Sequence, residues 1–145
     1  SKSSWLVTNY AKTDEYWDSH FSNRIVNIQK AKIMNGQKVM RLFIFDNPEE
    51  IEDQSKILNM QLGLGTEVRF LIKSSFINQQ KFKERIKKLE TIDFGIVDDN
   101  WVFRLFLDTK RRIRRINAVN DEDMLRVAKY LMDEMIKESE IYEKR

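Results

Sequence analysis

The chain has 145 residues, a length typical of one domain, and its 41% hydrophobic residues are enough to build a core beside 34% charged residues. The lack of cysteine excludes disulfides and thiolate metal sites, and the single histidine excludes a multi-histidine site, so no metal or other cofactor is predicted. No apolar run approaches the roughly 20 residues of a membrane span, and no signal-peptide pattern opens the chain. We expect one cytoplasmic domain over residues 1–145, excised from a longer protein because the sequence starts without Met.

The first elements alternate between helix and strand. Apolar residues at helical spacing predict an amphipathic helix over residues 14–34, with Ile25 and Ile28 on its buried side. Residues 38–45 (KVMRLFIF) form a nearly continuous apolar run, which is typical of a strand covered on both faces. A proline in its first turn then opens one helix over residues 48–63.

The second half of the chain is richer in strands. A strand, a basic helix, three further strands and a last helix capped by Asn120 are expected over residues 66–72, 78–89, 92–97, 101–107, 111–118 and 121–142. Early alternation favours parallel neighbours, and the later hairpins add antiparallel strands. We therefore predict an α/β fold with three layers, a mixed β-sheet flanked by helices.

The predicted core contains the apolar residues that face inward in these elements. They are Ile25, Ile28, Val39, Leu42, Ile44, Leu58, Val68, Phe70, Ile72, Ile96, Val102, Leu105 and Leu131. Four aromatic residues near the start, Trp5, Tyr10, Tyr16 and Trp17, are interpreted as a cover for the sheet. A pocket or an interface is the alternative, because Trp and Tyr are enriched at such sites.

An apolar strand, an acidic turn and a second apolar strand follow one another in TIDFGIVDDNWV. This segment resembles a unit of the phospholipase D superfamily, which carries a His, a Lys two positions later and an Asp five beyond that. Laid on this chain, those positions are Thr91, Asp93 and Asp98, and Leu105 and Phe106 stand where the family has Gly-Ser. The resemblance implies one half of a phospholipase D-type fold with a degenerate catalytic motif.

Such a half-domain is not expected to be an enzyme. Cleavage through a phosphohistidine needs an imidazole nucleophile and a cation for the phosphate, and Thr91 and Asp93 supply neither. The phospholipase D resemblance covers about residues 38–107. The related pattern toward the end of the chain, two strands around an acidic turn and then a charged hairpin and a helix, also resembles uncharacterised bacterial and archaeal domains of regulatory and mobile-element proteins. It implies a non-catalytic sensory or protein-interaction module of a larger regulatory or defence protein, whose partner is another protein or the rest of its own chain.

Other potential sites have simpler interpretations. His20 is expected to be a surface or boundary residue of the first helix, and Asp98 with Asp99 a hairpin turn in preference to a cation site. Gly63-Leu64-Gly65 lacks the third glycine of a dinucleotide-binding motif and is expected to be a helix cap and loop.

Two basic segments, residues 81–88 and 110–115, support an alternative function. Their cations are Lys81, Lys83, Arg85, Lys87, Lys88, Lys110, Arg111, Arg112, Arg114 and Arg115. Clustered cations are typical of phosphate binding, so the alternative is a nucleic-acid-binding domain. The net charge is only +3 and Asp108 and the acidic last helix can neutralise these cations, so a solvated face or an acidic protein partner is the competing explanation.

Self-association is also predicted. If the strands over residues 101–107 and 111–118 lie at the sheet edge, a second copy can pair with them and form a homodimer. Arginines of the last strand then need carboxylates from the partner copy. The candidates for that pairing are Glu122, Asp123 and Glu134.

Overall fold

The computed structural model describes residues 4–12 and 20–144, and side chains within the first helix from residue 23. Its strands are β1 (Ser4–Asn9), β2 (Lys38–Phe45), β3 (Glu67–Ile72), β4 (Asp93–Val97), β5 (Trp101–Leu107), β6 (Ile113–Val119) and β7 (Glu140–Ile141). They form one seven-stranded sheet in the order β6-β5-β4-β1-β2-β3-β7. The pairs β1 with β2 and β2 with β3 are parallel and the other four pairs are antiparallel, so the mixed sheet is confirmed.

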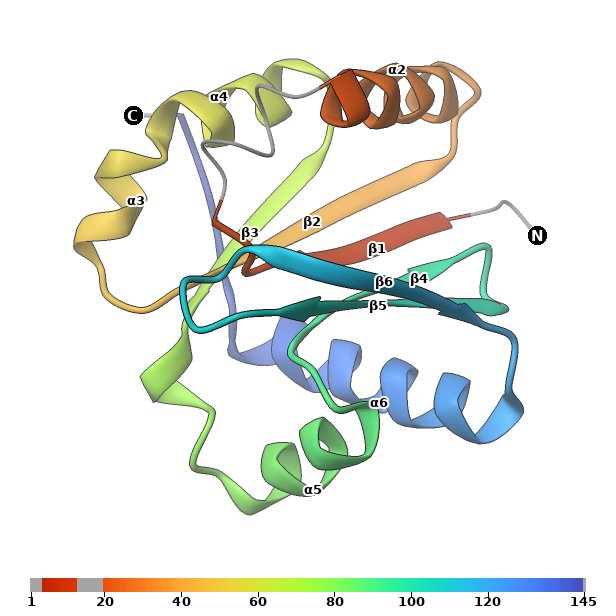
Figure 1. Cartoon of the computed structure of the whole chain (residues 1–145). Coiled ribbons are helices and arrows are strands. Elements are labelled where there is room, and N and C mark those ends of the chain that lie inside the picture. Colours follow the sequence, from red (N-terminus) through yellow and green to blue (C-terminus); the bar gives the residue numbers. More distant parts are fainter. Residues whose placement is uncertain (1–3, 13–19, 145) are drawn as a thin grey trace.

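Helices lie on both faces of this sheet. They are α2 (His20–Met34), α3 (Glu49–Asp53), α4 (Ser55–Gly63), α5 (Gln80–Leu89) and α6 (Glu122–Glu138), with a short 3₁₀ turn, η1, at Lys73–Ser75. Figure 1 shows α2, α3 and α4 above β2 and β3, with α5 and α6 below the sheet. The predicted three-layer α/β fold is confirmed.

The face that α5 and α6 cover, here called the covered face, carries the larger core. Amphipathic α6 buries Ala128, Leu131, Met132 and Met135 completely, because its apolar residues recur at helical spacing. A second cluster under α3 and α4 includes Leu58 and several strand residues. In β2, seven of eight residues are buried, as its continuous apolar run predicts.

Two strands were absent from the sequence-based prediction. The strand β1 occupies residues that were interpreted as a cover for the sheet, so Trp5 lies within the sheet itself. The last helix was predicted to reach residue 142, but α6 ends at Glu138 because Ser139 is extended. The chain then adds β7, and Tyr142 is buried with its backbone N–H donating to Val68 O at 2.9 Å.

Two helix boundaries also differ from the prediction. The single helix expected over residues 48–63 is split into α3 and α4 at Gln54, whose φ of −102° and ψ of 9° depart from helical values. The cap of α6 is Asp121 instead of Asn120, because the Asp121 side chain accepts from Asp123 N and Met124 N. The stop at Gly63-Leu64-Gly65 is confirmed, with Gly65 at a φ of +92°.

The predicted core is mostly buried, with one error. Ile25, Ile72 and Leu105 are half-buried, and Ile28 is 49% exposed. Ile28 is exposed because it lines an open cavity and belongs to neither of the two buried clusters. The other predicted residues are buried: Val39, Leu42, Ile44, Leu58, Val68, Phe70, Ile96, Val102 and Leu131. Across the described ranges, no helix is long and apolar enough to span a membrane.

Candidate functional site

The three positions of the degenerate motif do not converge on one site. Thr91 lies before β4, where its hydroxyl donates to Leu105 O at 2.6 Å and accepts from Asp93 N at 3.0 Å. Asp93 begins β4 and is 1% exposed, whereas Asp98 follows the other end of that strand. The Cα atoms of Asp93 and Asp98 are five residues apart along the extended strand β4, which corresponds to about 16 Å.

Asp93 fastens the end of β1 to the start of β4. Its carboxylate accepts from Tyr10 N at 3.1 Å, from Ala11 N at 2.8 Å and from the Thr8 hydroxyl at 3.1 Å. Burial raises the pKa of Asp93 to about 6, against the opposing effect of these hydrogen bonds. Asp93 therefore links β4 to the end of β1 through hydrogen bonds.

The Asp98-Asp99 pair forms a hairpin turn. The φ angles are 55° at Asp98 and 62° at Asp99, in the left-handed region that Asp tolerates in turns. The Asp98 carboxylate lies 3.7 Å from Lys32 Nζ. The turn interpretation is therefore confirmed, and no group of metal-ligating side chains occurs among the described residues.

The first basic segment forms α5, and two of its cations are engaged by α6. Lys81 Nζ lies 3.1 Å from a Glu134 oxygen and 3.5 Å from a Glu138 oxygen. These contacts raise the pKa of Lys81 and lower that of Glu134. The Arg85 guanidinium stacks on Tyr130 at 3.5 Å from the ring centroid. Lys81 and Arg85 thus hold α5 against α6.

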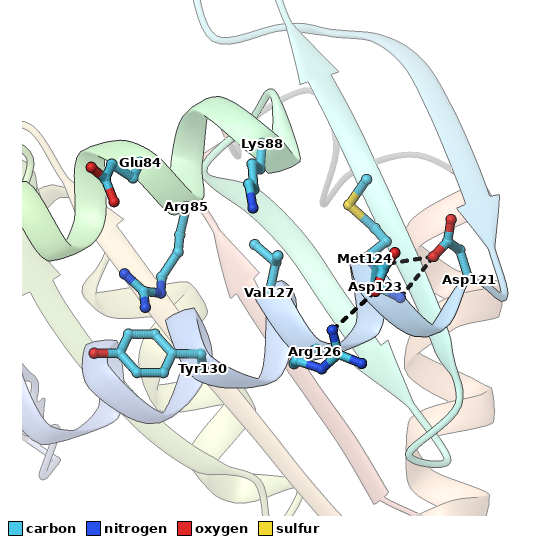
Figure 2. Close-up of a pocket in the computed structure, with 9 residues that line it drawn as sticks. All are labelled: Glu84, Arg85, Lys88, Asp121, Asp123, Met124, Arg126, Val127 and Tyr130. Carbon is cyan, nitrogen blue, oxygen red and sulfur yellow. Dashed lines mark hydrogen bonds and ion pairs between the residues drawn. The ribbon is translucent and has the colours of Figure 1, made fainter.

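The remaining cations of α5 face solvent. Lys83, Lys87 and Lys88 are exposed, and none of the three forms an ion pair within the described part of the chain. Lys88 also lines a cavity of about 640 Å³ between α5 and α6. Figure 2 shows that Glu84, Asp121 and Asp123 line the same cavity, so its charge is mixed and does not favour a phosphate.

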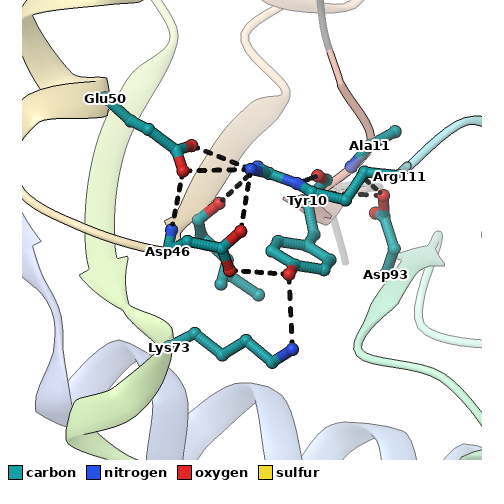
Figure 3. A network of polar contacts seen from close by, with 8 residues as sticks. Tyr10, Ala11, Asp46, Glu50, Lys73, Asp93 and Arg111 are labelled. Carbon is teal, nitrogen blue, oxygen red and sulfur yellow. Dashed lines mark hydrogen bonds and ion pairs between the residues drawn. The ribbon is translucent and has the colours of Figure 1, made fainter. Parts of the chain in front are cut away.

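The cations of the second basic segment do not share one environment: Arg111 points inward, and the others are exposed. Arg111 Nε donates to Tyr10 O at 2.8 Å, and Nη1 lies 2.9 Å from Glu50 and 3.3 Å from Asp46 (Figure 3). Its side chain is only 17% exposed. The Arg111 guanidinium is committed to this network, and we do not assign it to a nucleic-acid interface.

This network joins the carboxyl ends of the three neighbouring strands β1, β2 and β3. Tyr10 follows β1, Asp46 follows β2 and Lys73 follows β3. The Tyr10 hydroxyl donates to Asp46 Oδ1 at 2.7 Å and accepts from Lys73 Nζ at 3.3 Å (Figure 3). Burial raises the pKa of Tyr10. Two carboxylates balance two cations here, and the sequence analysis did not identify the group because its members lie far apart in the chain.

Arg112 and Arg114 share one carboxylate. Each places a guanidinium nitrogen 2.9 Å from Asp108 Oδ2. The backbone N–H of Arg112 is the main cause of a pKa near 2 at Asp108, and the Arg112 side chain lowers it further. This trio carries a net charge of +1, and the predicted neutralisation by Asp108 is confirmed for Arg112 and Arg114.

The end of α5 and the strand β6 meet through β5. Arg104 of β5 donates to Leu89 O of α5 at 3.2 Å, and its guanidinium lies 5.2 Å from the Phe106 ring. Exposed Arg115 of β6 lies over the same ring at 4.2 Å. We use the name cationic edge for the exposed cations of the last turn of α5 and of the β5–β6 hairpin that pair with no carboxylate among the described residues; they are Lys87, Lys88, Lys110 and Arg115.

The condition set for self-association, that the two hairpin strands lie at the sheet edge, is met by β6 alone. The strand β6 is the last in the sheet order, whereas β5 pairs on both sides, with β4 and β6. Homodimer formation through β6 stays a prediction. Tyr16, Trp17 and the side chain of His20 lie outside the described residues.

Comparison with known proteins indicates the fold but assigns no family. No family model matches the chain, and no curated protein matches its sequence. Over 96% of its length the chain is similar in structure to TrmBL2, an archaeal chromatin protein whose structure shows a novel mode of DNA binding, with a TM-score of 0.55 and 16% identity. The chain corresponds to 45% of that protein's length. The shared feature is the α/β fold, and the phospholipase D resemblance stays a prediction from the sequence.

Proposed function

We propose that this chain is a nucleic-acid-binding module within a larger DNA-associated protein. The observation that carries the proposal is the cationic edge, in a fold shared with a chromatin protein described as binding DNA. The edge combines exposed cations with a partly exposed aromatic ring, Phe106, beside Arg115. Lys and Arg at a surface neutralise backbone phosphates, and this supplies most of the affinity for nucleic acid.

Only some of the predicted cations serve this role. Lys81 and Arg111 are held by carboxylates, and Arg112 and Arg114 share Asp108. Arg85 is half-buried against the Tyr130 ring, whereas Arg115 stays exposed beside Phe106. The cations left for phosphates are Lys87, Lys88, Lys110 and Arg115, with Lys83 further along α5. A set of this size supports weak contact that depends little on base sequence.

The other functions expected from the sequence remain secondary. A sensory or protein-interaction module of a regulatory protein is compatible with the same fold, and its partner would be another protein or the rest of a longer chain. Absence of phosphodiesterase activity also stays a prediction. It is supported by the burial of Asp93 and by the engagement of Thr91 with Leu105 O.

A matched pair of charge variants tests the proposed function. K87Q/K88Q/R115Q removes three charges from the cationic edge, and R24Q/K30Q/K56Q removes three exposed charges from α2 and α4. Fluorescence anisotropy with a short DNA duplex at low salt measures the affinity. We expect the first variant to bind at least about a hundredfold more weakly than wild type and the second to change little, because only the first removes three phosphate contacts. An equal loss in both variants would contradict the assigned surface.

A further inference from the structure

A second feature lies on the face of the sheet opposite α5 and α6. Beyond β1, no described helix covers β4, β5 and β6 on this side, here called the open face (Figure 1). A cavity of about 450 Å³ occupies it, bounded by these strands and by α2. Its walls are mainly apolar and include Val7, Ile25, Phe103, Leu105 and Ile116.

Gly95 leaves space at the base of the cavity because it has no side chain. Gly95 of β4 pairs with Val7 of β1, and a Cβ built at Gly95 would lie 2.5 Å from Val7 Cγ1. Any larger residue would therefore push the Val7 side chain out of its place. The size of the cavity and its apolar walls are typical of sites for small molecules.

A buried cation stands at one end of the cavity. Arg41 of β2 is 4% exposed and lines the cavity together with Asn9. Its Nη1 donates to Asn9 Oδ1 at 3.0 Å and its Nε to Gln29 Oε1 at 3.2 Å. The Gln29 side-chain amide in turn donates hydrogen bonds to the buried side chains of Gln61 and Thr66. These contacts hold Gln29, and Gln29 orients the Arg41 guanidinium.

A second cation and an aromatic ring complete this end. Lys32 of α2 lines the cavity with its side chain 20% exposed, and its Nζ lies 5.9 Å from the Trp5 ring centroid. The Arg41 guanidinium lies at the same distance, 5.9 Å, from that ring. Lys32 Nζ also lies 3.7 Å from the Asp98 carboxylate. The positive charge of Arg41 lowers the pKa of buried Asp93, against the larger effect of burial. Two cations thus converge at one end of an otherwise apolar space.

We infer that this cavity binds an amphipathic carboxylate, with the carboxylate at Arg41, Lys32 and Asn9 and the hydrocarbon part along β5 and β6. The positive charges of Arg41 and Lys32 favour an anionic group at this end, and the aliphatic and aromatic walls favour an apolar tail. A sugar is disfavoured because it would need polar partners along its whole length, and polar groups gather only at one end. The inference is independent of the nucleic-acid proposal, since none of the cations assigned to the cationic edge lines this cavity.

Titration with three ligands of the same tail length tests the inference. Sodium decanoate, decanol and decyltrimethylammonium are added to the chain, and affinity is measured by calorimetry while ¹H–¹⁵N NMR follows the Trp5 indole. We expect decanoate to bind at one site, about tenfold more tightly than decanol, with decyltrimethylammonium weaker than both. Equal affinity for decanoate and decanol would overturn the inference, because the cations would then play no part.

Variants at the two ends of the cavity make the test specific. Arg41→Met removes the buried charge, and Lys32→Gln removes the rim charge if the Arg41 variant does not fold. Each is expected to weaken decanoate at least threefold and to leave decanol unchanged. Ile116→Asp on the apolar wall should weaken both, and Met34→Asp at an 86% exposed site on α2 is the control. Sedimentation that reveals a dimer dissociated by Ile116→Asp, with no decanoate binding, would mean that this face is a protein interface and would overturn the inference.

Discussion

The two faces of this sheet carry similar apolar side chains but meet different surroundings. On β5, Val102 points to the covered face and is 0% exposed, whereas its neighbours Phe103 and Leu105 point to the open face and are half-buried. Alternation along a strand places these residues on opposite sides. The covered face is completed by α5 and α6, and the open face is left as a cavity with Arg41 at its end.

The covered face therefore contributes mainly to stability, and the open face is available for binding. Apolar residues on the covered face remove surface from water and stabilise the sheet. Those on the open face stay accessible, as Ile28 at 49% and Ile116 at 47% exposure illustrate. Substitutions on the two faces should therefore have different consequences.

The largest effect is expected at the centre of the covered face. Leu131→Ala removes a completely buried side chain of α6 and leaves a cavity, so the free energy of unfolding should fall by about 3 kcal/mol. Urea unfolding followed by circular dichroism measures this loss. Leu131→Met is the control and should cost less than about 1.5 kcal/mol, because it nearly conserves volume.

A pH-dependent effect of similar size is expected at Asp93, where the two halves of the sheet meet. Its pKa rises on folding from 3.8 to about 6, so the native state holds a proton that the unfolded state has lost between these values. Stability from this group is therefore present at low pH and falls as the pH rises from about 4 to about 6, by about 3 kcal/mol in all.

Asp93→Asn isolates that contribution. An Asn oxygen can still accept from Tyr10 N and Ala11 N, and its nitrogen can donate to the Thr8 hydroxyl. Relative to wild type, the variant should gain stability as the pH rises from about 4 to about 7. Urea unfolding at a series of pH values measures the difference, and a difference independent of pH would contradict the assignment.

The smallest stability effect is expected on the open face. Ile28→Ala removes a side chain that is half exposed at the cavity, so it should lower the free energy of unfolding by less than about 1 kcal/mol. The same urea experiment compares it with Leu131→Ala. A loss as large as that of Leu131→Ala would mean that another element covers Ile28, and the comparison of the two faces would fail.

The elements with strong patterns were predictable from the sequence. The sequence correctly predicts β2 and α6. A strand buried on both faces, such as β2, shows a continuous apolar run, and a helix buried along one stripe, such as α6, shows apolar residues at helical spacing. The strand β1 mixes Trp, Thr and Asn in six residues, and β7 has only two residues, so neither carries a clear period. Their place depends on partners distant in the chain.

The sites were less predictable than the fold, because local charge patterns do not reveal distant partners. Arg111 lies 65 residues from Asp46 and 61 from Glu50, so its sequence neighbourhood suggested an exposed cation. Arg41 is the one arginine of an apolar strand, and a lone arginine in such a run is itself a signal of a buried polar role. Only the three-dimensional arrangement shows which cations are engaged and which face solvent.

The salt dependence of DNA affinity tests the proposed function most directly. If about four cations of the cationic edge neutralise phosphates, affinity should fall about a hundredfold between about 50 and about 200 mM monovalent salt, with a slope near −4 on logarithmic axes. K87Q/K88Q/R115Q should reduce that slope to near −1, since each lost contact removes about one unit. A wild-type affinity that stays constant across this salt range would contradict nucleic-acid binding by this chain.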